Sequence, residues 1–159
     1  MSRKLQYVLN CVGILGIVSA LFGSFFVEFF YGEEPCILCF LQRASMLATG
    51  VCFWFNFFSG ICIQNYAMAL CWSVFGLIVA LKHASLNVCR TVDSPFFILS
   101  YRLYTWSIFV FFILLLGIAL LIYLYKPLSK RAPSILWLST GALLFIALIV
   151  CFFSAIFVR

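Results

Sequence analysis

Two cysteines three positions apart, Cys36 and Cys39, stand at the start of a long apolar segment. Pro35 directly precedes them, and proline suits the first turn of a helix, so the sequence predicts that the pair lies at a helix N-terminus. A Cys-x-x-Cys pair in that place can close a small disulfide loop. The amides of a helix N-terminus also stabilise a thiolate, which is the reactive form of cysteine. The pattern therefore predicts a redox-active pair.

Arg43 follows Cys39 by four positions, so we expect the two side chains to share one helical face, with Gln42 on the adjacent face. An arginine inside a membrane helix is costly and is a functional candidate by default. Two roles are open to it: it stabilises a Cys39 thiolate, or it donates hydrogen bonds to a ligand that carries a carbonyl group. The alternative is an arginine that only extends its charged end to the membrane surface.

A metal site is the other chemistry open to a cysteine pair. Zinc takes about four ligands in proteins, whereas this chain has one histidine, His83, and no second Cys-x-x-Cys motif. We therefore expect no metal, and the pair together with Gln42 and Arg43 favours redox chemistry.

The elements that position these residues must be membrane helices. The chain has 159 residues, of which 67% are hydrophobic and 9% are charged, more apolar surface than a soluble domain of this size can bury. The net charge of +6 is not gathered into a basic face, so we expect no nucleic-acid partner.

The apolar runs predict an all-α membrane protein, a four-helix transmembrane bundle with a fifth helix. We expect a redox domain over residues 1–125, with an outer loop over 83–102, and a basic turn with the fifth helix over 126–159. Apolar residues at 95–99 predict a short interfacial helix in that loop. A short link near Cys62 indicates an antiparallel helix pair. The four helices of the bundle are predicted at about 5–30, 36–59, 66–82 and 103–125.

Basic residues set the orientation that we expect. Arg3, Lys4 and the basic turn after residue 125 place the N-terminus in the cytoplasm. Cys36, Cys39 and Cys89 then face the opposite compartment, where disulfides persist. Cys62 is expected to be structural in its loop. The remaining cysteines are expected to fill apolar space: Cys11, Cys52, Cys71 and Cys151.

The ten residues from Glu34 to Arg43, EPCILCFLQR, resemble the signature of the DsbB/BdbC family of disulfide-bond-formation proteins. The resemblance covers about residues 5–125. It implies a bacterial plasma (inner) membrane enzyme that reoxidises a DsbA-like, thioredoxin-fold dithiol oxidase outside the cytoplasm. Electrons would pass to a quinone, either ubiquinone or menaquinone.

The resemblance also implies roles for single residues. Cys36 and Cys39 would be the pair next to the quinone, and Cys39 would form the charge-transfer contact with it. Arg43 would bind the quinone head, beside Gln42. His83, predicted at the end of the third helix, resembles a histidine near the family's quinone site.

The sequence departs from the family pattern in two places. Family members carry a second cysteine pair in the loop after the third helix, whereas this loop has only Cys89. Three roles stay open for Cys89: it attacks the partner and is resolved by Cys36, it forms an intermolecular bond, or it is idle and the partner reacts directly at Cys36. The fifth apolar run is the second departure.

Two other functions remain as alternatives. One is a vitamin K epoxide reductase-like quinone reductase, although the redox pair of such proteins lies in a later helix. The other is a non-enzymatic membrane scaffold with a static Cys36–Cys39 disulfide, which predicts no dependence on quinone.

Overall fold

The computed structural model describes residues 3–31, 36–58, 60–89, 97–98 and 101–125. Four helices make up nearly all of this part: α1 (Arg3–Tyr31), α2 (Ile37–Phe58), α3 (Ile63–Cys89) and α4 (Leu103–Tyr123). Two very short strands, β1 (Phe97–Ile98) and β2 (Tyr101–Arg102), pair antiparallel just before α4.

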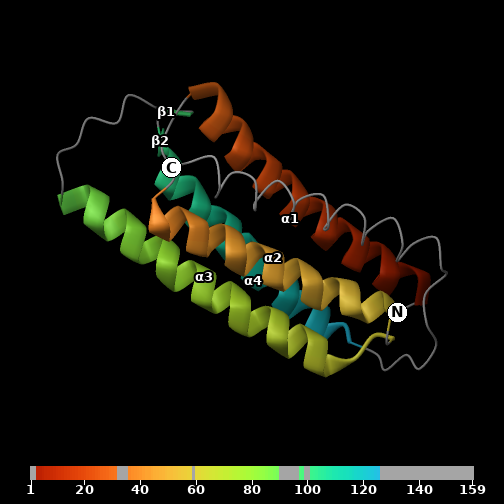
Figure 1. Cartoon of the computed structure of the whole chain (residues 1–159). Coiled ribbons are helices and arrows are strands. Elements are labelled where there is room, and N and C mark those ends of the chain that lie inside the picture. Colours follow the sequence, from red (N-terminus) through yellow and green to blue (C-terminus); the bar gives the residue numbers. More distant parts are fainter. Residues whose placement is uncertain (1–2, 32–35, 59, 90–96, 99–100, 126–159) are drawn as a thin grey trace.

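The helices form an antiparallel bundle in which α1 packs on α2, α2 on α3, α3 on α4, and α4 back on α1 (Figure 1). The link between α2 and α3 is short and contains Gly60, whose φ of 89° lies in the left-handed region that glycine adopts without strain. The predicted antiparallel pairing of these two helices is therefore confirmed.

Each helix is long and apolar enough to cross a membrane. The candidate spans are 26, 22, 24 and 19 residues long in α1, α2, α3 and α4. Large apolar side chains also cover the outside of the bundle, for example Phe30, Ile78 and Ile113, which are 72%, 59% and 67% exposed. An outer surface of this kind suits lipid, and it supports a multi-pass membrane protein.

The core is filled by aromatic and branched side chains, and α3 approaches its neighbours closely at one glycine. A methyl group on Gly76 would overlap the Phe111 ring of α4 and lie against Ser45 Oγ of α2. Both neighbours are fully buried. Gly76 thus lets three helices meet at close range, a packing device common in membrane bundles.

Buried amide side chains tie the helices together at the end of the bundle that lies away from Cys36. Asn10 Nδ2 donates to Tyr66 Oη at 2.7 Å, and Asn56 Nδ2 donates to Asn10 Oδ1 at 3.0 Å. Asn65 Nδ2 donates in turn to Asn56 Oδ1 at 2.9 Å. We call Asn10, Asn56, Asn65 and Tyr66 the asparagine clamp. It joins α1, α2 and α3.

The structure corrects the predicted end of the third helix. α3 begins at Ile63 and continues to Cys89, so His83 lies inside this helix and Cys89 at its end, not in a loop. Polar residues such as Lys82 and Ser85 do not stop a helix; proline or glycine does, and the first one after Gly76 is Pro95.

The predicted interfacial helix over 95–99 is also wrong where the structure describes it, because Phe97 and Ile98 pair with β2. Antiparallel pairing lets backbone groups of these residues form hydrogen bonds between strands instead of within a helix. The predicted fifth helix and Cys151 lie outside the described residues, as does Pro35.

Candidate functional site

Cys36 and Cys39 lie at the start of α2, as the sequence predicts. Cys36 directly precedes the helix, and its carbonyl oxygen accepts a hydrogen bond from the Phe40 amide at 3.1 Å. Its sulfur accepts the Cys39 amide at 3.3 Å, so Cys36 serves as the N-cap of the helix.

The two sulfurs are adjacent but differ in access. Both cysteines are thiols in this structure, with Cys36 Sγ and Cys39 Sγ 2.8 Å apart. Cys36 is exposed, whereas Cys39 is half-buried. A molecule that approaches from outside the bundle therefore meets Cys36 first.

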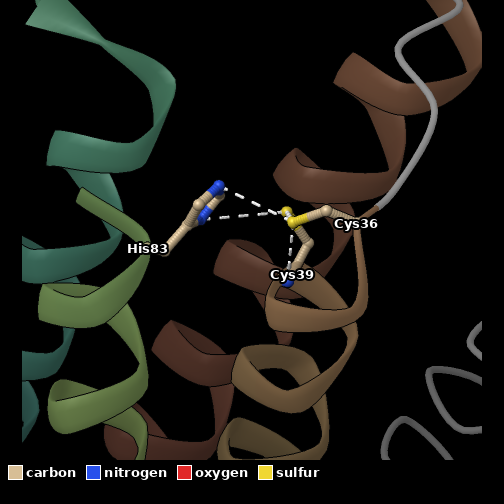
Figure 2. A group of neighbouring side chains, drawn as sticks. All are labelled: Cys36, Cys39 and His83. Carbon is tan, nitrogen blue, oxygen red and sulfur yellow. Dashed lines mark hydrogen bonds between the residues drawn. The ribbon is translucent and has the colours of Figure 1, made fainter. Parts of the chain in front are cut away.

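His83 of α3 points at the cysteine pair (Figure 2). Its Nε2 lies 3.6 Å from Cys36 Sγ, and its Nδ1 lies 4.0 Å from Cys39 Sγ. Gln42 Nε2 lies 3.4 Å from the same Nδ1, so a second side chain of α2 contacts this nitrogen. The imidazole can therefore exchange a proton with the sulfurs, and the Gln42 amide orients it. The structure thus brings His83 of α3 together with three residues of the Glu34–Arg43 motif, Cys36, Cys39 and Gln42.

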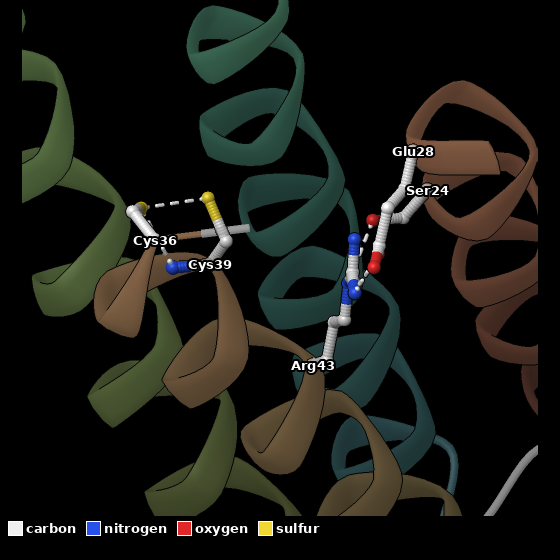
Figure 3. Close-up of polar contacts among 5 residues, drawn as sticks. All are labelled: Ser24, Glu28, Cys36, Cys39 and Arg43. Carbon is white, nitrogen blue, oxygen red and sulfur yellow. Dashed lines mark hydrogen bonds and ion pairs between the residues drawn. The ribbon is translucent and has the colours of Figure 1, made fainter. Parts of the chain in front are cut away.

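Arg43 lies further along α2, but its guanidinium points away from the sulfurs and toward α1 (Figure 3). Its Nη1 donates to Glu28 Oε2 at 2.5 Å, and its Nε donates to Ser24 Oγ at 2.9 Å. The Phe25 ring lies 4.6 Å from the guanidinium carbon. Spacing along α2 suggested a direct role at Cys39, whereas the contacts found are with α1.

Glu28 is a site residue that the sequence analysis did not single out. The side chain is only 8% exposed and lies within the apolar span Leu5–Phe30. A signal was present: Phe29 and Phe30 follow Glu28, so the apolar run continues past the charge. An acidic residue inside such a run calls for a partner.

Comparison with known proteins decides the family. The model of the family described as "Disulfide bond formation protein DsbB" matches residues 6–89, more than half of the chain. The chain belongs to the DsbB family. The match spans α1, α2 and α3 and includes Cys36, Cys39, Arg43 and His83. Neither the search of curated proteins nor the search of solved structures found a match.

Membership of the DsbB family confirms the resemblance carried by residues 34–43. Together with the four apolar helices, it makes this chain a multi-pass membrane protein with an oxidoreductase role in disulfide bond formation. The roles of individual residues in that reaction remain predictions.

Cys89, the third candidate, ends α3. It lies about 9 Å beyond His83 along the helix axis, at the usual rise per residue. The last turns of α3 extend past the start of α2 (Figure 1). The backbone of Cys89 is therefore at the same end of the bundle as Cys36 and Cys39, which we call the cysteine end.

The cysteine end also brings three potential metal ligands together. The sulfurs of Cys36 and Cys39 and a ring nitrogen of His83 all lie within 4.8 Å of one another. These are three ligands, one fewer than a closed zinc site takes. The expectation of a metal-free redox pair stays a prediction.

Proposed function

We propose that this DsbB-family protein is a thiol:quinone oxidoreductase. It reoxidises an extracytoplasmic, DsbA-like dithiol oxidase of the thioredoxin fold through a Cys36–Cys39 disulfide, and it passes the electrons to a membrane quinone. The observation that carries the proposal is the juxtaposition of two sulfurs 2.8 Å apart with His83 against both, at one end of a membrane bundle.

The first half of the reaction is thiol–disulfide exchange. A partner thiolate attacks Cys36 Sγ in the disulfide form, the Cys36–Cys39 bond breaks, and Cys39 leaves as a thiolate. The second partner thiol then attacks the mixed disulfide and releases Cys36. The partner loses two electrons and the pair gains them. The greater exposure of Cys36 supports its role as the attacked atom.

His83 is placed to manage protons in this exchange. Its ring nitrogens face both sulfurs, so it can protonate a departing thiolate or accept a proton from an attacking thiol. Gln42 holds the ring in position from the α2 side.

The donors at the cysteine end fit a quinone head. Quinones carry neutral carbonyl oxygens that accept hydrogen bonds, and Gln42, His83 and Arg43 supply donors. Ile37 and Phe40 beside them are 82% and 47% exposed, which gives an apolar tail a lipid-facing surface. A bound ubiquinone or menaquinone would supply the two-electron acceptor at this place. The half-buried Cys39 is the sulfur we assign to contact with it.

The wider arrangement follows the charge pattern of the chain. We propose that the N-terminus is cytoplasmic and that the cysteine end faces the periplasm or the cell exterior. Residues 1–125 form the redox domain, and residues 126–159 add a basic turn and a further helix. Cys89 lies at the end of the bundle that the thiol partner approaches, so we propose it as a participant in electron entry.

The family match favours this function over a vitamin K epoxide reductase-like activity. The static-disulfide scaffold remains the alternative from a different class, because Cys89 is the one cysteine near the place where the family carries a second pair.

Quinone reduction by the full chain in detergent, fed by a reduced thioredoxin-fold dithiol protein, tests the proposal. Cys36→Ser and Cys39→Ser are expected to abolish turnover, and Cys89→Ser shows whether Cys89 carries electrons. Cys71→Ser is the matched control, because Cys71 is an exposed cysteine earlier in α3. If the wild type reduces neither a benzoquinone nor a naphthoquinone while its Cys36–Cys39 bond stays oxidised, the scaffold alternative replaces this function.

A further inference from the structure

Glu28 is a buried carboxylate in a membrane-spanning segment and has no part in the reaction described so far. Its Oε2 pairs with Arg43. Its Oε1 is also buried and has no hydrogen-bond donor among the described residues. Removing a charge from water costs free energy unless an opposite charge and hydrogen bonds offset it. The pair is therefore expected to serve a purpose beyond joining α1 to α2.

Three neighbouring groups of α1 fix the Arg43 guanidinium. Ser24 Oγ accepts from Nε, Glu28 Oε2 accepts from Nη1, and the Phe25 ring covers the planar group. Ser24 and Glu28 are one helical turn apart, so they present their oxygens on the same face. A guanidinium held at two nitrogens and one face keeps a single orientation.

Not all N–H groups of Arg43 are used by the contacts with α1, so some can donate to a ligand. Arginine carries five N–H groups in one rigid plane. Within the part of the chain that the structure describes, Nη2 has no hydrogen-bond partner, and unlike Glu28 Oε1 it is not a fully buried atom. The direction in which Nη2 points is set by the contacts with α1, because the guanidinium is planar.

We propose that Glu28, assisted by Ser24, is a positioning residue for quinone recognition. Glu28 holds the guanidinium so that the Nη2 donors of Arg43 meet a carbonyl oxygen of a neutral quinone. α1 thereby contributes to a site whose other residues come from α2 and α3. This inference rests on the proposed quinone-reducing function and adds a residue to it.

The test measures steady-state quinone reduction by the full chain in detergent, at saturating reduced dithiol partner, with the concentration of a short-chain benzoquinone varied. Thiol exchange is followed separately as the single-turnover oxidation of the partner by the oxidised protein without quinone. The variants are Glu28→Gln, Glu28→Asp, Arg43→Gln and the Glu28→Gln/Arg43→Gln double variant.

Loss of the charged hydrogen bond is expected to raise the KM for quinone roughly tenfold in Glu28→Gln. Thiol exchange, which does not involve Arg43, should keep its wild-type rate. Glu28→Asp, which keeps the charge, should recover part of the KM. Glu28→Gln should have no further effect in the Arg43→Gln background, because Glu28 acts only through Arg43.

Several results would overturn the inference. One is a quinone KM in Glu28→Gln within about twofold of the wild-type value. Another is a rise in quinone KM on Glu28→Gln that is as large in the Arg43→Gln background as in the wild type. A third is a fall in the rate of thiol exchange as large as the loss in quinone reduction, which a merely structural role would produce. Absence of quinone reduction in the wild type defeats the proposed function and this inference together, whereas a normal wild type with an unchanged Glu28→Gln defeats the inference alone.

If Glu28→Gln does not fold, the quinone KM of Ser24→Ala is measured instead. This substitution removes one contact of the guanidinium, so a smaller rise in quinone KM is expected. Ser19→Ala is its matched control, because Ser19 is an exposed serine of the same helix. Equal KM values in these two serine variants would also contradict the positioning role.

Discussion

The asparagine clamp and the cysteine pair, at opposite ends of the bundle, differ in burial and in the length of their polar contacts. In the asparagine clamp, Asn10, Asn56 and Tyr66 are at most 1% exposed and are linked by hydrogen bonds of 2.7 and 3.0 Å. At the cysteine end, Cys36 is exposed, and the contacts of His83 with the sulfurs are 3.6 and 4.0 Å long.

The asparagine clamp therefore serves stability, whereas the cysteine end serves the reaction. Hydrogen bonds among the buried Asn10, Asn56 and Tyr66 side chains join three helices. Longer contacts around an exposed sulfur leave atoms that a partner thiol or a carbonyl can reach. A bundle held firmly at one end can therefore tolerate a loosely bonded, reactive group at the other.

The largest effect is expected from breaking the cysteine end itself. Cys39→Ser removes the sulfur that completes the disulfide, so quinone-coupled partner oxidation should fall by more than about a thousandfold, as for the loss of an essential nucleophile. The melting temperature should stay near the wild-type value, because the asparagine clamp is untouched. Parallel turnover and thermal-unfolding measurements check this, and a large loss of stability would contradict the division between the two ends.

The second effect concerns proton handling at the same end. His83→Ala removes the imidazole beside both sulfurs, and partner oxidation is expected to slow by roughly tenfold to a hundredfold. Ser85→Ala is the control, because Ser85 is exposed and its hydroxyl donates to the Lys82 carbonyl within the helix. Single-turnover thiol exchange measures the effect, and equal rates in both variants would exclude a catalytic His83.

The third prediction concerns the close packing of Gly76 against Phe111 and Ser45, between the two ends of the bundle. Gly76→Ala forces a methyl group into Phe111 and Ser45, so overpacking should cost about 1–3 kcal/mol of stability. Gly16→Ala is the matched control, because a methyl group there meets nothing within 4 Å. Thermal unfolding in detergent compares the two, and an equal melting temperature would contradict the close approach of α3.

Breaking the asparagine clamp should have the smallest effect on chemistry. Asn56→Leu removes donors and acceptors shared with Asn10 and Asn65, and it should lower stability by about 1–2 kcal/mol. Turnover per folded molecule should not change. A fall in kcat at unchanged stability would show that the asparagine clamp and the cysteine end are coupled.

Much of the framework could be predicted because it depends on residues close together in the chain. Apolar runs predict the four helices, since a helix must satisfy its backbone within the bilayer. The Cys-x-x-Cys pair follows a proline, and this local pattern placed both cysteines at the start of α2. The motif around them also indicated the DsbB family, which the family match over residues 6–89 confirms.

Element ends were less predictable. Polar residues after Leu81 suggested that the third helix stops, yet α3 continues to Cys89. Residues above a membrane surface still form a helix where no proline or glycine interrupts it, so hydropathy indicates where a span ends and not where its helix ends.

Composition and one local motif are enough to predict a membrane protein with a cysteine pair at a helix start. The contacts of His83 with that pair, of Glu28 with Arg43 and of Asn10 with Asn56 depend on how the helices pack. The partners in these contacts are 47, 15 and 46 positions apart, on different helices. Helical periodicity tells which residues share one face, but packing between helices decides which faces meet.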